Sequence, residues 1–179
     1  MNFNTLYDLI NEGTAPRSYS CLMLDCGFLL EDIRDHIHSA ICPCDVYDDE
    51  PGHGIEEQIH TTVLYGIHTE KFSEVTESVE LKPCSFKIQN ISLFKNDKYD
   101  VLKFGLTSKD LSYLNKQCCE GLDYTNSYPD YKPHITLAYL KPGMGKVYSK
   151  LKCDLIGTSW TSDIFIFSDK NSNKVHYRA

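Results

Sequence analysis

The sequence predicts an α+β protein with two lobes, each an antiparallel sheet backed by helices. Two observations predict this fold class. Segments with strand alternation and segments with helical spacing follow one another in an order that occurs twice along the chain. Each copy also contains a β-branched strand that starts with His-x-Thr, at residues 60–62 and again at 134–136. A duplicated unit of this kind buries the apolar face of each sheet under its own helices, which gives two lobes.

The first half of the chain has distinct helix, strand and loop signals. Gly13 ends a run with helical apolar spacing, and Leu29, Ile33, Ile37 and Ile41 lie on one stripe of a second helix. Pro, Gly and acidic residues gather before the first motif, and loops of that length inside compact domains tend to be functional or mobile. The expected elements are a helix at 4–12, a strand at 17–26, a helix at 28–41, a loop at 42–58 and a strand at 59–67.

The second half repeats these signals around a hairpin. The turn Asn96-Asp97-Lys98 between two alternating runs is typical of a β-hairpin. We expect one domain over 17–179, preceded by an N-terminal extension over 1–16. The expected elements are a helix at 69–79, strands at 85–94 and 99–106, a helix at 108–120, a tyrosine-rich loop at 122–132, a strand at 133–140, and further strands within 154–160, 163–168 and 173–178.

Composition predicts a soluble, cytoplasmic protein without a membrane partner. The chain has 179 residues, 41% of them hydrophobic, which is enough for one core or for two small lobes that share an interface. No apolar run approaches the roughly 20 residues that cross a bilayer, and the first residues lack the positive start of an export signal.

Charge is distributed unevenly along the chain. Residues 1–60 hold 12 acidic and 2 basic residues, and the net charge of the whole chain is −7. An acidic first third argues against binding long nucleic acid, which relies on many phosphate contacts. The run 141–152 has four lysines and no acidic residue. It either borders a site for a small anion or forms a solvated turn.

Eight cysteines raise the question of disulfides or a metal. Without an export signal, free thiols are expected. His36, His38, Cys42 and Cys44 suggest zinc, because imidazole and thiolate are its usual ligands. The spacing of two residues puts neither pair on one helix face, so surface histidines and half-buried thiols are favoured. We expect no metal and no cofactor.

The two motifs place histidine beside threonine. Side chains at i and i+2 share a strand face, so His60 lies beside Thr62, and His134 beside Thr136. Two facing histidines form an acid and base pair, because imidazole titrates near neutral pH. The threonine hydroxyls hydrogen-bond a charged oxygen between them, as phosphoryl transfer requires, and this chemistry needs no metal.

A tyrosine also ends both motifs. Strict alternation puts Tyr65 on the strand face opposite His60, and Tyr139 opposite His134. We therefore expect both tyrosines to be structural residues of the core.

At these residues the sequence resembles the 2H phosphoesterase superfamily, over roughly residues 17–168. Segments 58–68 and 130–140 look most like the phage-encoded branch, which includes anti-CBASS phosphodiesterases that destroy the cyclic oligonucleotide signals of bacterial immunity. The resemblance implies a bilobal fold with pseudo-two-fold symmetry around a central cleft, and a metal-independent enzyme in the cytoplasm of a host bacterial cell. It also implies that His60 is the acid and His134 the base.

A nucleotide substrate needs an aromatic platform, since stacking is worth about 1–3 kcal/mol per base. The candidates are Tyr19 in the first strand, Phe94 between the motifs and Tyr131 just before the second motif. Lys132 is the candidate for a phosphate contact.

Three functions are consistent with these residues, and neither base preference nor oligomeric state follows from them. The favoured one is hydrolysis of 3′,5′ bonds in cyclic di- or trinucleotides. The second is an RNA 2′,3′-cyclic phosphodiesterase or a 2′-5′ RNA ligase-like enzyme. The third is a sponge that binds nucleotides without cleaving them, and two intact motifs count against it.

Overall fold

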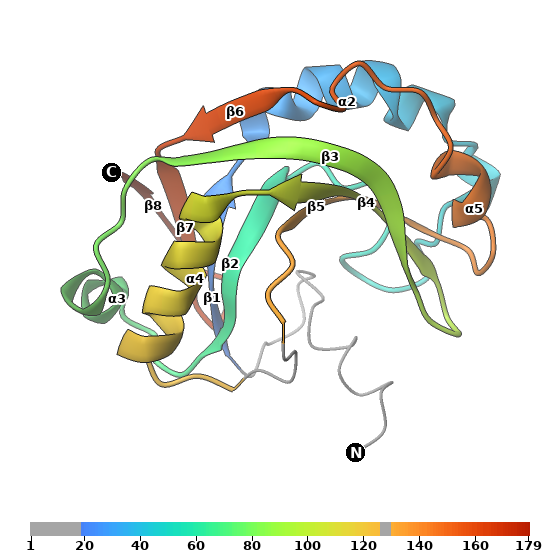
Figure 1. Cartoon of the computed structure of the whole chain (residues 1–179). Helices are drawn as coiled ribbons and strands as arrows, with labels where there is room; N and C mark the ends of the chain where they lie inside the picture. Colours follow the sequence, from blue (N-terminus) through green and yellow to red (C-terminus); the bar gives the residue numbers. More distant parts are fainter. Residues whose placement is uncertain (1–18, 126–129) are drawn as a thin grey trace.

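One continuous antiparallel sheet organises the chain, in a computed structural model that describes residues 19–125 and 130–179 (Figure 1). The predicted helix at 4–12 lies outside the described residues. The sheet has eight strands in the order β6-β3-β4-β5-β2-β1-β7-β8. The strands are β1 (Ser20–Asp25), β2 (His60–Ile67), β3 (Cys84–Lys95), β4 (Asp100–Thr107), β5 (His134–Leu140), β6 (Ser159–Ser162), β7 (Ile164–Ser168) and β8 (Lys174–Arg178).

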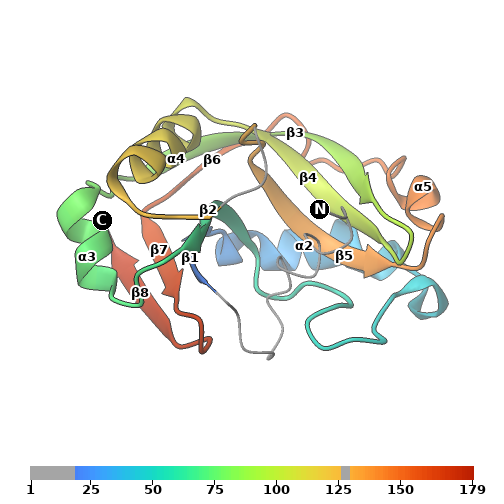
Figure 2. The ribbon, with the colours of Figure 1, turned by 90° about the horizontal axis from the view of Figure 1, so that it is seen from below.

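Helices α2 (Leu30–His36) and α4 (Lys109–Gly121) contribute their apolar side chains to the core on one face of this curled sheet. Figures 1 and 2 show α3 beside α4 at one end, and α5 beside the tip of the β3–β4 hairpin at the other. Among the described residues, no helix has the length and apolar character needed to cross a membrane. The helices are α2 (Leu30–His36), α3 (Phe72–Ser78), α4 (Lys109–Gly121) and α5 (Gly145–Tyr148), with 3₁₀ turns at Gly27–Leu29, His38–Ala40 and Pro43–Asp45.

The prediction of two separate sheets is wrong. The two four-stranded halves meet where β5 and β2 run side by side, and only Thr61 and Ile135 pair there. Both of these side chains are fully buried. The halves are therefore joined by a short seam, and the two motif strands diverge on either side of it.

The loops that lead into the motif strands cover the edges exposed by this divergence. The Tyr139 N–H donates to Gly54 O (2.8 Å), so part of the predicted loop 42–58 runs along β5. The Thr125 N–H donates to Gly66 O (2.9 Å), so the segment before β5 runs along β2. Each loop thus pairs with the opposite motif strand, which satisfies backbone groups that a free edge would expose.

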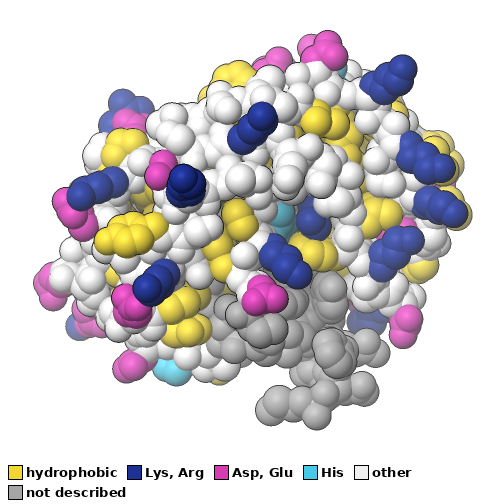
Figure 3. All heavy atoms as spheres, viewed as in Figure 1, with side chains coloured by type: hydrophobic (Ala, Val, Ile, Leu, Met, Phe, Trp, Pro, Cys, Tyr) yellow, Lys and Arg dark blue, Asp and Glu magenta, His cyan; other side chains and the backbone are white. Residues whose placement is uncertain are grey.

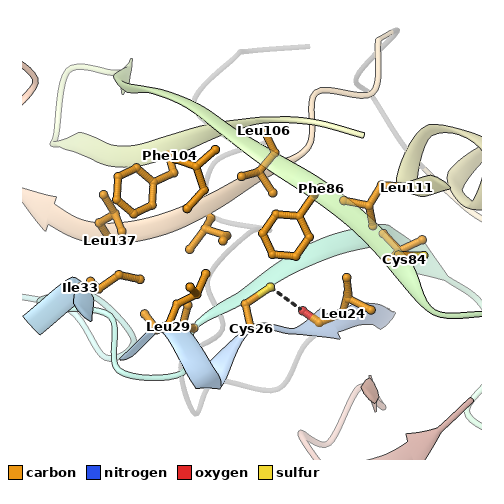
Figure 4. Close-up of a cluster of buried hydrophobic side chains, with 14 of the residues drawn as sticks. Leu24, Cys26, Leu29, Ile33, Cys84, Phe86, Phe104, Leu106, Leu111 and Leu137 are labelled. Atoms are coloured by element: carbon orange, nitrogen blue, oxygen red, sulfur yellow. Dashed lines mark hydrogen bonds between the residues drawn. The ribbon is translucent and has the colours of Figure 1, made fainter. Parts of the chain in front are cut away.

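The main core lies between the sheet and the helices (Figure 4). The predicted stripe of helix 28–41 is buried, although 3₁₀ turns interrupt the helix on both sides of α2. Phe86 and Phe104 reach this core from β3 and β4, and Leu111 reaches it from α4. The Ser108 side chain caps α4 by accepting the Leu111 N–H (2.9 Å), as the sequence predicts for a helix N-terminus.

The expectation that every cysteine is a free thiol is wrong for one pair and correct for the other six. Cys42 and Cys44 form a disulfide, although free thiols were expected throughout. The other six cysteines are free, and five of them are buried. Burial raises the pKa of Cys84 to about 11 and that of Cys118 to about 12, so both are neutral packing groups at physiological pH.

The lysine-rich run 141–152 forms a turn and the short helix α5, which the sequence did not predict. The Gly145 N–H donates to the Asp100 carboxylate (3.0 Å). Asp100 pairs with Leu140, at the end of β5 opposite to His134. The run is therefore a solvated turn, and it does not border the motif residues.

Candidate active site

The two motif histidines are held in the same way. His60 Nδ1 lies 2.5 Å from Gln58 O, and His134 Nδ1 lies 2.9 Å from Lys132 O. A carbonyl oxygen only accepts hydrogen bonds, so Nδ1 carries the proton in each neutral ring. Nε2 is therefore the nitrogen with the lone pair in both neutral rings.

The seam between β2 and β5 brings the motifs together. Thr61 and Ile135, the middle residues of the two motifs, pair across it and point into the core. The flanking residues of each motif point to the other face of the sheet. His60, Thr62, His134 and Thr136 therefore share this face, and we call them the two-histidine site. Figure 3 shows a histidine side chain near the centre of the view, with Lys or Arg side chains beside it.

The first motif strand contains a β-bulge directly after its threonine. Met23 pairs with Thr62 and Leu22 pairs with Leu64, so Val63 is an extra residue without a partner in β1. An extra residue shifts the alternation of side chains by one position. The Val63 carbonyl instead accepts from Asn115 Nδ2 of α4 (2.7 Å).

The second motif strand has a bulge at the equivalent position. Lys103 pairs with Thr136 and Leu102 pairs with Ala138, so Leu137 is the extra residue. The Leu137 carbonyl accepts from His38 Nε2 (3.0 Å), which gives His38 a structural role. Burial lowers the pKa of His38, and the neutral ring suffices to donate this bond.

These bulges overturn the strand face predicted for the two motif tyrosines, although Tyr139 is buried in a small core cluster of its own. Tyr65 packs against Cys21, Met23 and Ile166, a cluster separate from the main core. Because Cys21 and Met23 share one face of β1 and Met23 pairs with Thr62, Tyr65 lies on the face of the two-histidine site.

Tyr139 follows the same rule in the second strand. It pairs with Val101 and packs with Tyr47 and Tyr99, again outside the main core. Val101 and Lys103 share one face of β4, and Lys103 pairs with Thr136. Both tyrosines therefore flank the site, because strict alternation does not continue through a bulge.

His134 has an aromatic and cationic environment. The Phe94 ring contacts the His134 ring edge to face, with centroids 5.0 Å apart. The Lys103 ammonium lies 4.2 Å from the centroid of Phe94 and donates to Ser92 Oγ (3.0 Å). Burial lowers the pKa of Lys103, and the charge of Lys132 lowers it further. Lys103 was not identified from the sequence, where it is a single lysine inside an apolar strand.

His60 has an acidic neighbour instead. Asp25 pairs with His60 across β1 and β2, which places both side chains on the same face. The Gly27 N–H donates to Asp25 Oδ1 (2.6 Å) and so fixes the carboxylate at the end of β1. This pairing could not be predicted from the sequence, because it depends on the register between two strands.

The structure separates the four predicted substrate-binding residues. Phe94 lies against His134. Lys132 holds His134 through its carbonyl group, and its side chain is exposed. Tyr19 stacks on His68 (centroids 5.4 Å apart), beside the Ser20–Ile67 end of the strand pair, roughly 20 Å of strand away from His60. Tyr19 is therefore not brought together with the histidines.

Tyr131 connects the motifs and is not an open platform. Its hydroxyl donates to Thr62 O (2.9 Å), and its ring packs against the main core. Burial raises the pKa of this hydroxyl, which is therefore a neutral donor. A residue just before the second motif thus holds the backbone of the first.

Tyr131→Phe should lower the free energy of unfolding by about 1–2 kcal/mol, because a half-buried carbonyl group loses its donor. Urea denaturation measures this change. Tyr113→Phe is the matched control, since Tyr113 is 64% exposed and its loss of a hydroxyl should cost close to nothing. Equal stability of the two variants would contradict the role of Tyr131.

The fold is shared with solved phosphoesterase structures. The structure of Kluyveromyces marxianus Usb1 with uridine monophosphate has 9% identity and a TM-score of 0.52, and the match covers 90% of this chain and 98% of that one. The structure of E. coli LigT complexed with phosphate has 10% identity and a TM-score of 0.53, with 90% and 93% covered. Its complex with 3'-AMP has 12% identity and the same TM-score, with 90% and 94% covered. The chain therefore shares a phosphoesterase fold, on which it carries two His-x-Thr motifs.

A comparison of the sequence with models of protein families identifies the family of this chain. The family model described as anti-CBASS protein Acb1 matches residues 53–156, which is more than half of the chain and includes both motifs. The chain therefore belongs to the Acb1 family of anti-CBASS proteins. No curated protein matches it in sequence.

Proposed function

We propose that the two-histidine site hydrolyses 3′,5′ phosphodiester bonds of cyclic di- or trinucleotides that act as immune signals. The matching hydrogen bonds at Nδ1 of His60 and His134 carry this proposal, because they place the proton on Nδ1 and the lone pair on Nε2 in both neutral rings. The substrate would lie in a cleft between the two halves of the sheet, whose predicted pseudo-two-fold symmetry would place one motif on each side of it.

In the proposed reaction, the base takes a proton from a water or from the neighbouring 2′-hydroxyl. That oxygen forms a bond to phosphorus, and the bond from phosphorus to the leaving oxygen breaks. The acid then gives its proton to the leaving oxygen. The hydroxyls of Thr62 and Thr136 stabilise the nonbridging oxygens as their charge develops.

The charges around the two histidines favour His60 as the acid. The Asp25 carboxylate opposite His60 stabilises an imidazolium there. Lys103 contacts the same Phe94 ring as His134, and the Lys132 carbonyl holds His134, so both lysines disfavour a second positive charge there, which suits a neutral base. These neighbours support the order of roles that the family resemblance implies.

The surroundings of the site also favour a small nucleotide over long RNA. Phe94 provides an aromatic ring beside His134, on which a base can stack. The acidic first third of the chain would repel an extended polyanion. The exposed side chain of Lys132 remains a candidate phosphate contact.

A panel of cyclic di- and trinucleotides and linear RNAs with 2′,3′-cyclic phosphate ends tests the substrate. The protein is incubated with each compound in excess chelator, and products are identified by mass spectrometry. We expect cleavage of at least one cyclic oligonucleotide. Cleavage of the linear RNA ends alone would favour the RNA phosphodiesterase alternative, and recovery of a tightly bound, intact nucleotide would favour a sponge.

Asp25→Asn tests the assignment of the acid. The amide oxygen of asparagine can still accept the Gly27 N–H, but the negative charge opposite His60 is lost. The imidazolium then loses its proton at lower pH, so the alkaline limb of the pH profile of kcat/KM should move to lower pH. An unchanged alkaline limb, or a shift of the acidic limb alone, would argue for the opposite order.

A further inference from the structure

Lys103 is a buried cation in β4 to which no described residue offers an acidic partner. Its relative exposure is 8%. The ammonium group has three N–H donors, and its contacts are a hydrogen bond to Ser92 Oγ and the ring face of Phe94. Among residues 19–125 and 130–179, no carboxylate forms an ion pair with it, whereas several exposed lysines there have acidic partners.

The register of the sheet places Lys103 beside the two-histidine site. It pairs directly with Thr136 of the second motif, so the two side chains share a face. The next residue on that face of β4 is Gly105, which pairs with His134. Gly105 itself contributes no side chain between Lys103 and His134. Phe94 contacts both the Lys103 ammonium and the His134 ring, so these three side chains form one connected group.

A buried, unpaired ammonium group is costly for folding, and an apolar residue of the same length would pack there at lower cost. The hydroxyl of Ser92 and the ring of Phe94 compensate only part of the lost hydration. An anion in the site would compensate the remainder, and a phosphate group is the anion that the neighbouring threonine and histidine suit.

We propose that Lys103 binds a nonbridging phosphate oxygen of the substrate, beside the Thr136 hydroxyl. This inference rests on the proposed phosphodiesterase function. Lys103 then neutralises charge on the phosphoryl group, Phe94 holds the ammonium in place from behind, and the exposed Lys132 is not required for this contact.

Lys103→Met tests the proposal, because methionine keeps the length of the side chain and removes its charge. Lys116→Met is the matched control. Lys116 is exposed on α4, which packs on the core face of the sheet, and its ion pair with Glu120 (3.7 Å) is solvent-exposed and weak. We expect kcat/KM on a cleaved cyclic oligonucleotide to fall about 10²-fold in the Lys103 variant. The Lys116 variant should retain the wild-type value.

Two further measurements distinguish a phosphate-binding role of Lys103 from a structural one. The midpoint of thermal unfolding of Lys103→Met should equal or exceed that of wild type, because an unpaired buried charge is gone. Inorganic phosphate, compared with chloride at matched ionic strength, should stabilise wild type and Lys116→Met more than Lys103→Met. The control variant accounts for the general effect of phosphate on protein stability.

The proposal would be overturned if phosphate raised the unfolding midpoint equally in all three proteins. It would also be overturned if Lys103→Met lost activity together with a lowered unfolding midpoint while its stabilisation by phosphate stayed intact. If wild type cleaves nothing in the panel, the proposed function fails, and the phosphate measurement still decides whether Lys103 binds this group.

Discussion

Replacing His60 or His134 with alanine should lower kcat for cyclic oligonucleotide cleavage by about 10²–10⁴-fold, the usual contribution of a general acid or base. Each ring is oriented by a backbone carbonyl, and alanine removes the proton-transfer group from each motif. The double variant should lose little more than either single variant, because acid and base act in the same step. Single-turnover rates with saturating enzyme measure these effects.

His176→Ala is the matched control for both variants. His176 is an exposed residue of β8, on the outer edge of the sheet, and its removal should leave kcat unchanged. Wild-type rates in both motif variants would reject two-histidine catalysis, whatever the substrate.

Gly66→Ala should have the largest effect on stability, with a loss of about 4 kcal/mol in the free energy of unfolding. Gly66 has a φ of +88°, and a Cβ atom there would lie 1.9 Å from the backbone oxygen of Thr125. The same contact is where the segment before β5 pairs with β2, since the Thr125 N–H donates to Gly66 O. The substitution therefore strains the backbone and also displaces the chain that leads to the second motif.

Gly157→Ala isolates the first of these two effects. Gly157 has a φ of +91° and nothing within 4 Å of an added Cβ atom, so it should cost only the roughly 1–2 kcal/mol of a left-handed conformation. Urea denaturation of both variants gives the difference. Equal losses of unfolding free energy in the two variants would show that the segment with Thr125 moves at no cost. That result would contradict its close pairing with β2.

The positions of the motif strands followed from sequence because their signals are local. β-Branched runs and the two His-x-Thr motifs predicted the strands that became β2 and β5, and turn residues predicted the hairpin of β3 and β4. The apolar stripe from Leu29 to Ile41 predicted a buried helical segment for the same reason.

The faces of the motif tyrosines did not follow, because a bulge depends on partners far away in the chain. Val63 and Leu137 are ordinary strand residues in sequence, and their carbonyl groups are held by Asn115 and His38 from other elements. Strict alternation was therefore the natural prediction for Tyr65, and it was wrong.

The charged neighbours of the histidines were missed for a related reason. Asp25 faces His60, and Lys103 faces Thr136, only through the register of paired strands. The single sheet could not be predicted from the sequence either, since only one residue pair, Thr61 with Ile135, joins its halves.

Mass spectrometry of a cyclic dinucleotide or trinucleotide after incubation with the wild-type protein in excess chelator tests the central claim most directly. A two-histidine phosphodiesterase should open a ring at a rate that does not depend on the chelator. The linear product is heavier by one water when water is the nucleophile, and has the mass of the ring but a 2′,3′-cyclic phosphate end when the 2′-hydroxyl is the nucleophile. Recovery of every ring intact, or cleavage that stops when metal is removed, would contradict the account.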